Sequence, residues 1–114
     1  MATIYKVLGQ ALPSPNTFTT LYTVPLSTQA ILSTLNVCNT STDKGPGANL
    51  TFRVAVRPGG ETIATKHYIV YDAIVPVQDS ISLSLGMTTG NTDVVTVFST
   101  LGNVVFSLFG TEIS

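Results

Sequence analysis

The sequence predicts an all-β fold, an antiparallel β-sandwich of about eight strands. Short runs rich in Val, Ile, Thr and aromatic residues recur at intervals of about twelve residues, separated by Gly, Pro, Asn and Asp. No window has the length and period that predict a helix. Because strand order is not encoded in this spacing, a jelly roll and an immunoglobulin-like sandwich both fit. We expect residues 1–114 to form one domain, since the chain has no internal repeat and no linker.

The N-terminal part supplies three of the predicted strands. Residues 3–8 are rich in β-forming residues and two prolines follow them, so residues 1–17 are predicted to be an N-terminal arm or an edge strand. Residues 18–24 form the next run. In residues 31–38 a helix is the competing prediction, but the Thr, Val and Cys content favours a strand. The alternation there places four residues on one face: Ile31, Ser33, Leu35 and Val37.

A hairpin is predicted at the centre of the chain. Residues 40–48 form the clearest loop, and after it alternate residues of the next run are apolar and expected to be buried: Leu50, Phe52, Val54 and Val56. Pro58 fixes φ for a turn, and Gly59 tolerates the positive φ that a type II turn requires. Residues 66–71 are predicted to be the returning strand.

The C-terminal part supplies three further strands. Pro76 interrupts residues 74–79, and residues 80–85 then alternate between Ser and apolar residues, the pattern of a half-exposed strand. Residues 86–92 are predicted to turn the chain before a strand at 93–99. A tight connection at 101–103 leads to the last strand, residues 104–109.

The shortage of charge is the most informative feature of the composition. Charged residues make up 10% of the chain, against about 25% in an ordinary domain. A soluble chain of this kind must cover its surface with Thr, Ser and apolar groups, so we expect it to form an oligomer. No apolar run reaches the roughly 18 residues of a membrane span. The net charge of −1 and the scattered basic residues argue against nucleic-acid binding.

The titratable residues do not form a recognisable catalytic or metal-binding motif. His67 is predicted to lie in a strand and to be hydrogen-bonded to a neighbour, and no Gly-x-Ser-x-Gly elbow accompanies it. One His and one Cys cannot complete a structural zinc site, and Cys38 is expected to be a buried, inert thiol. Asp72, Asp79 and Asp93 each lie near a predicted turn, where Asp commonly caps its own backbone. We therefore expect no enzymatic activity, no cofactor and no metal.

Four residues are candidates for an interface. Arg53 and Arg57 lie on the same non-core face of one predicted strand, about 13 Å apart. They either bind carboxylates of a neighbouring subunit or keep an exposed sheet face hydrated. Tyr68 and Tyr71 are candidates for stacking on a sugar, or for core and interface packing.

Several stretches, in order along nearly the whole chain, resemble a group of small virion structural proteins of tailed bacteriophages. They are residues 4–10, 21–25, 37–39, 53–60, 66–72 and 109–113. These motifs are strand and turn signatures with no catalytic residue among them, and the loop at 40–48 looks longer than is typical of that group.

The resemblance implies a β-sandwich built into the virion in many copies, after synthesis in the host cytoplasm. The favoured role is a capsid decoration or cement protein, a homo-oligomer and commonly a trimer, which contacts the major capsid protein. The alternatives are a neck, tail or fibre component, or an adhesin that binds host glycans.

Overall fold

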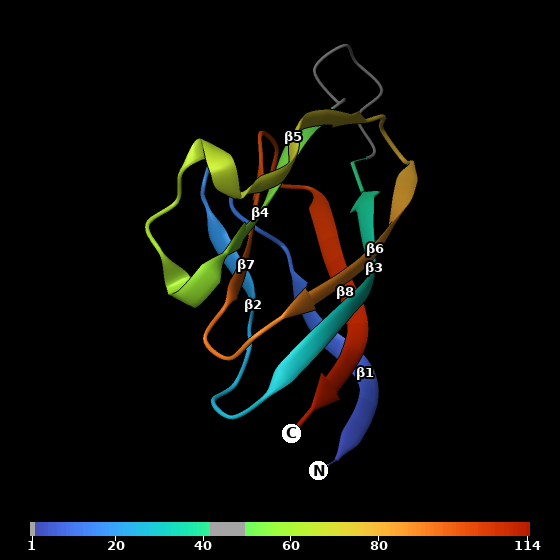
Figure 1. Ribbon diagram of the computed structural model, residues 1–114. Coiled ribbons are helices and arrows are strands. Elements are labelled where there is room, and N and C mark those ends of the chain that lie inside the picture. The colour runs from blue at the N-terminus through green and yellow to red at the C-terminus, as the bar shows by residue number, and fades with distance from the viewer. Residues whose placement is uncertain (1, 42–49) are drawn as a thin grey trace.

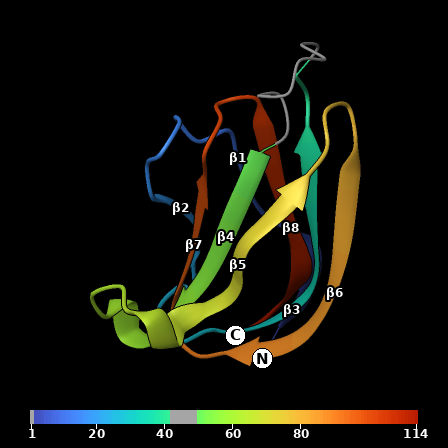
Figure 2. The same cartoon turned by 90° about the horizontal axis from the view of Figure 1, so that it is seen from above.

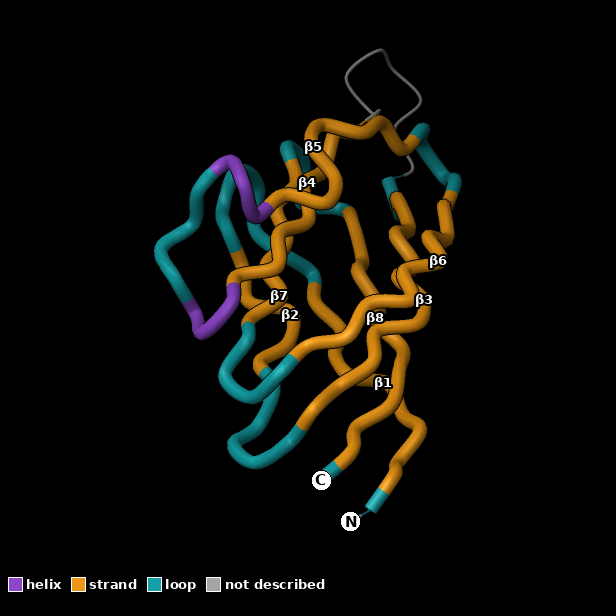
Figure 3. The backbone as a smooth tube through the Cα atoms, viewed as in Figure 1, coloured by secondary structure: helices purple, strands orange, loops and turns teal. Residues whose placement is uncertain are grey.

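The alternating runs of the sequence form two four-stranded sheets that pack face to face (Figure 1). The computed structural model of the chain describes residues 2–41 and 50–114. Among these residues the strands are β1 (Thr3–Ala11), β2 (Thr19–Thr23), β3 (Gln29–Asn39), β4 (Leu50–Arg57), β5 (Tyr68–Val75), β6 (Ser80–Thr89), β7 (Val94–Ser99) and β8 (Val104–Ile113). Two short 3-10 turns, η2 (Pro58–Gly60) and η3 (Thr65–His67), lie between β4 and β5 (Figure 3).

The strand order identifies the fold as a jelly roll. One sheet has the order β1-β8-β3-β6 and the other β2-β7-β4-β5, and neighbouring strands are antiparallel. Figure 2 shows β4 and β5 in one layer and β8, β3 and β6 in the other. Only β4 and β5 are neighbours both in sequence and in a sheet, so the other connections cross between the sheets. This is the double Greek key of a jelly roll rather than an immunoglobulin-like arrangement.

The core fills the space between the sheets. The rings of Phe52 on β4 and Phe106 on β8 meet edge to face with centroids 5.9 Å apart, and both residues are fully buried. Leu35, Leu108 and Val97 are buried to the same degree around them. Leu50, Phe52 and Val54 are buried as predicted, whereas Val56 is only half-buried and Ala55 is buried instead.

Register irregularities interrupt the pairing of all four edge strands. On β1 the irregularity lies between Val7 and Gly9, and on β2 between Thr20 and Tyr22. The pairings of β5 with β4 and of β6 with β3 are shifted in the same way. Such bulges twist an edge and hinder the addition of a further strand.

The bulge in β3 corrects one sequence prediction. Pairing with β6 and β8 shifts between Leu32 and Thr34, so the buried set is Ala30 and Leu32 before the shift, and Leu35 and Val37 after it. Ile31 and Ser33 therefore lie on the exposed face, contrary to the prediction. Cys38 is half-buried rather than fully buried.

Strand ends also differ from the predicted ones. Residues 86–89 continue β6 instead of turning, because they pair with β3 beyond Gly86, which has a φ of 59°, and the turn follows at Gly90. Similarly, β1 continues to Ala11, and β8 to Ile113. His67 ends a 3-10 turn instead of lying in a strand. Gly59 has the predicted positive φ, 62°.

Most of the predicted loop at 40–48 lies outside the described residues. The described part of the chain contains no helix long and apolar enough to cross a membrane.

Candidate interaction surface

Three of the four predicted interface residues come together on the outer face of the β2-β7-β4-β5 sheet. The Arg53 guanidinium carbon lies 4.3 Å from the ring centroid of Tyr71 and 5.9 Å from that of Tyr68. The two tyrosine rings meet edge to face with centroids 5.0 Å apart. The cluster thus presents two aromatic rings around one cation, a favourable arrangement of ring quadrupole and charge.

A bulge in β5 brings Tyr71 and Asp72 to the same arginine. Phe52 pairs with Ala73 and Val54 with Val70, so two residues of β5 oppose Arg53. Asp72 adopts a φ of 56° at this point. Its carboxylate accepts hydrogen bonds from Arg53 Nε at 2.7 Å and Nη2 at 3.3 Å. Asp72 therefore pairs with a side chain, whereas the sequence predicted that it caps a turn.

The ion pair fixes the charge states of both partners. The hydrogen bonds from Arg53 lower the pKa of Asp72, and those bonds raise the pKa of the Arg53 guanidinium. Arg53 thus has a carboxylate partner in its own chain. Its position is explained by this pairing, without a carboxylate from another subunit.

The sequence did not single out two further aromatic residues of this cluster. Phe98 faces Arg53 across the β4–β7 pair, with its ring centroid 5.0 Å from the guanidinium carbon. Phe18 stacks on Phe98 with centroids 4.8 Å apart. Phe98 lies on β7 and Phe18 directly precedes β2, both far from residue 53 in sequence, so only the strand order could have revealed them.

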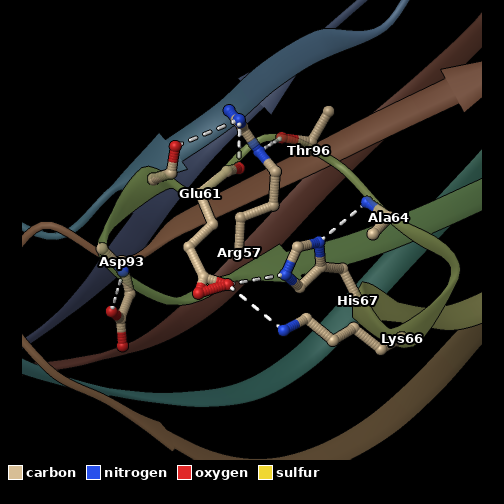
Figure 4. A network of polar contacts seen from close by, with 9 residues as sticks. Arg57, Glu61, Ala64, Lys66, His67, Asp93 and Thr96 are labelled. Atoms are coloured by element: carbon tan, nitrogen blue, oxygen red, sulfur yellow. Dashed lines mark hydrogen bonds and ion pairs between the residues drawn. The ribbon is translucent and has the colours of Figure 1, made fainter.

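Arg57 has a separate, local role. Its Nε donates to Thr96 Oγ1 at 3.1 Å and its Nη1 to the carbonyl of Glu61 at 2.9 Å (Figure 4). Asp93 accepts a hydrogen bond from the Gly59 amide at 2.8 Å. These contacts hold the β4–β5 connection against β7, so Arg57 supports a loop.

His67 closes the same connection from inside. The backbone N–H of Ala64 donates to His67 Nδ1 at 3.0 Å, so Nδ1 must be the unprotonated nitrogen. Nε2 then carries the proton and faces Glu61 Oε1 at 3.3 Å (Figure 4). The hydrogen bond with His67, followed by the charge of Lys66, lowers the pKa of Glu61. The imidazole is buried and both of its nitrogens are occupied, so it serves as a structural link.

A partly buried polar contact joins the two sheets. Tyr22 on β2 donates its hydroxyl proton to Glu112 on β8 at 2.5 Å, and Lys6 on β1 pairs with the same carboxylate at 3.2 Å. The Tyr22 hydrogen bond lowers the pKa of Glu112, whereas burial and then Glu112 raise the pKa of Tyr22. This triad was not predicted, because residues 6, 22 and 112 are brought together only by the sheet pairing.

Two of the three aspartates that the sequence places near turns do cap backbone amides. Asp79 and Asp93 cap backbone amides of Ser80 and Gly90 as their sequence context predicts. Within residues 2–41 and 50–114, no three His, Cys, Asp or Glu side chains lie close enough to share a metal ion. What the surface offers chemically is aromatic and apolar contact area.

Comparison with known proteins identifies no family for this chain. No family model matches the chain, and no curated protein matches it. Among solved structures, the chain is similar to a pentameric capsid protein isolated from metagenomic phage sequences. The TM-score is 0.30 with 19% sequence identity, over 96% of this chain and 60% of that one. The chain thus spans about three fifths of the length of that protein.

Proposed function

We propose that this chain is a structural protein of a bacteriophage virion, and that it acts as a decoration or cement protein on the head. It would be made in the host cytoplasm and would bind the major capsid protein and further copies of itself. Its work is to bury surface between subunits, which requires no catalytic residue and no cofactor. The sequence resemblance to small phage virion proteins supports a place in the phage particle.

One observation carries the proposal. Many large apolar side chains of the described residues are exposed, and the whole chain has only 11 charged residues among 114. The most exposed are Tyr5 at 82%, Leu26 at 74%, Leu12 at 65%, Ile74 at 62% and Tyr71 at 59%. Exposed apolar surface of this kind is unfavourable for a monomer in water, whereas in a lattice the neighbouring subunits cover it. Jelly rolls are also a recurrent fold of capsid and lectin domains, although a fold alone does not fix a function.

The N-terminal segment enters the proposal in a different way from that expected. β1 is paired along its length with β8, and the Ala2 and Ser114 backbones are hydrogen-bonded to each other at 2.7 and 2.9 Å. The two ends lie side by side in Figure 1. Contact with a shell protein would therefore use the sheet faces and loops instead of a free arm.

Electron microscopy of purified phage particles tests this function. Gold-labelled antibodies against the chain should decorate the heads of particles from the phage that encodes it. Particles from a deletion phage should stay unlabelled and should disrupt at lower temperature. Labelling confined to the neck, tail or fibres would replace the cement role with one of those alternatives, and unlabelled wild-type particles would refute the proposal.

A second candidate is recognition of a host-surface glycan by the aromatic cluster. Tyr71 is more than half exposed next to Arg53, and tyrosine rings beside hydrogen-bonding groups are suited to sugar rings. A glycan array probed with wild-type protein and with Tyr71→Ala tests it. Binding that the variant loses would support this role, and a blank array with folded protein would remove it.

A further inference from the structure

The outer face of the β1-β8-β3-β6 sheet contains no charged side chain among its described residues. The two charged residues in these strands are Lys6 and Glu112. Glu112 points between the sheets, because it accepts the Tyr22 hydroxyl from the opposite sheet, and Lys6 pairs with it there. A solvent-facing sheet side without charge is unusual, since exposed positions normally carry much of a protein's Lys, Arg, Asp and Glu.

Apolar residues occupy one end of this face in two cross-strand rows. In the first, Tyr5, Thr111 and Ile31 are aligned across β1, β8 and β3; in the second, Val7, Phe109 and Thr34. Tyr5 is 82% exposed, and Val7, Phe109 and Ile31 are between 37% and 46% exposed. A depression next to Ile31 is lined by Thr88 and Ile113, and further by residues 29, 30, 89 and 90 at the ends of β3 and β6. Tyr5 projects from β1, on the other side of β8.

The other end of the face is polar but still uncharged. Gln10 Nε2 donates to Ser107 at 3.2 Å, and Asn36 Nδ2 donates to Ser82 at 3.0 Å. These amides and hydroxyls satisfy one another across the strands. The half-buried thiol of Cys38 belongs to this end, because its neighbours Val37 and Asn39 point inward.

We propose that this face pairs with the same face of a second copy of the chain. This inference rests on the proposed structural function and names the partner of one sheet. A partner of a different kind would normally be selected by complementary charge, and this face has none to offer. Two identical faces without charge meet with no like-charge repulsion, whatever the rotation between them.

The register of the strands gives the symmetry of the pair. Tyr5 and Ile31 lie one strand to either side of Thr111, about 4.8 Å away in each direction. A two-fold axis parallel to β8 therefore places Tyr5 of each copy over Ile31 of the other, next to the depression. Phe109 lies near the axis and meets its own counterpart.

The area of overlap fits a weak, reversible pair. An axis along β8 brings β1, β8 and β3 over their counterparts, and three strands about 4.8 Å apart and about ten residues long cover about 490 Å² per copy. Two copies then bury about 980 Å², close to the smallest area of a specific interface. The bulges in the edge strands disfavour side-by-side extension of the sheet. Pairing of this kind closes at two copies, so it predicts a dimer in place of the trimer that the family resemblance implies.

Light scattering on size-exclusion fractions tests the pairing. We expect a mass of about 24 kDa, twice the 12.0 kDa of one chain. Ile31→Glu and Tyr5→Lys should each weaken association at least about 100-fold, because each places two uncompensated charges in the interface. Ile74→Glu, on β5 of the other sheet and 62% exposed, is the matched control and should stay dimeric.

A charge-reversal rescue separates the interface from a folding defect. In the double variant Tyr5→Lys with Ile31→Glu, each new lysine faces a new glutamate of the other copy, so the dimer should return. Circular dichroism confirms that each variant is folded. Failure of the double variant to associate, with both single variants folded and monomeric, would overturn the two-fold register.

The single cysteine of the sequence reports which face is covered. Labelling of Cys38 by a thiol reagent should slow as the protein concentration rises, and Ile31→Glu should abolish this dependence. A dimer with unchanged Cys38 labelling, or a wild-type monomer at 100 µM (about −5.5 kcal/mol of association free energy), would overturn the inference. A monomer that still decorates phage heads would leave the proposed function standing, and a dimer absent from the particles would reject that function alone.

Discussion

Replacing Gly110 by alanine should destabilise the fold more than replacing Gly86 by alanine. These are the two glycines of β8 and β6. Gly110 lies in β8, the strand between β1 and β3. An added Cβ would lie 2.1 Å from the Ile31 carbonyl oxygen and 2.9 Å from Leu8 Cδ1. Ordinary contact begins at 3.4 Å, so the β3 backbone would have to move away by about 1.3 Å. A flexible side chain could yield, but a hydrogen-bonded strand cannot do so cheaply.

The expected loss follows from two terms. Overpacking a tight site costs about 1–3 kcal/mol, and weakening two backbone hydrogen bonds beside Gly110 adds about 1 kcal/mol each. Together these give about 3–5 kcal/mol, a large part of the 5–15 kcal/mol that stabilises an ordinary domain.

Urea unfolding followed by circular dichroism measures this loss. Gly86→Ala is the control, because Gly86 has a φ of 59° and no atom within 4 Å of an added Cβ. Its cost is the left-handed conformation alone, about 1–2 kcal/mol. If Gly110→Ala lost no more stability than Gly86→Ala, the register of β8 against β3 would be wrong, and the interface argued from that register with it.

Three further outcomes are expected. Because the pKa of Glu112 is lowered in the folded state, its contact with Tyr22 and Lys6 should stabilise the protein above about pH 4.3, and this stabilisation should be lost as the pH falls through the folded-state pKa. In Glu112→Gln, the midpoint of urea unfolding should therefore depend less on pH in the acid range. The raised pKa of Tyr22 has the opposite sign, so stability should fall as the pH rises above about 10, and Tyr22→Phe should lose that alkaline dependence while costing about 1 kcal/mol at pH 7. Nitrogen-15 NMR should show the Nε2–H tautomer of His67; a protonated Nδ1 at neutral pH would contradict its hydrogen bond from Ala64.

Local patterns in the sequence were sufficient to predict most strands. The Ser and Leu alternation of residues 80–85 is the clearest case, because one face of β6 is half-buried and the other exposed. The sequence predicts a turn at Gly86 because glycine readily adopts a positive φ, and Gly86 does so, but pairing with β3 continues the strand on both sides of it. The bulge at Ser33 has no sequence signal, so a strict period of two predicts the wrong face for Ile31 and Ser33.

Long-range pairing decided what could be predicted of the surface. Arg53, Tyr68 and Tyr71 are recognisable from local sequence, as an arginine on an apolar strand and two tyrosines on the following one. These three residues come together because β4 and β5 are neighbours, as the predicted hairpin requires. Prediction of Phe98 requires the order β7-β4 as well, and prediction of the uncharged outer face of the other sheet requires the order of all four of its strands. Sequence spacing contains no information on either order.

The position of β8 has a consequence for how the protein is made. It follows β1 and β3 in the sequence, yet both of these strands pair with it. A nascent chain therefore cannot close this sheet before β8 has been synthesised, and β1 has to wait for its neighbour until then. Closure of the sheet after synthesis of β8, on the millisecond-to-second scale of such non-local β topologies, is the expected route. Deletion of β8 would remove the neighbour of β1 and leave β3 paired with β6 alone.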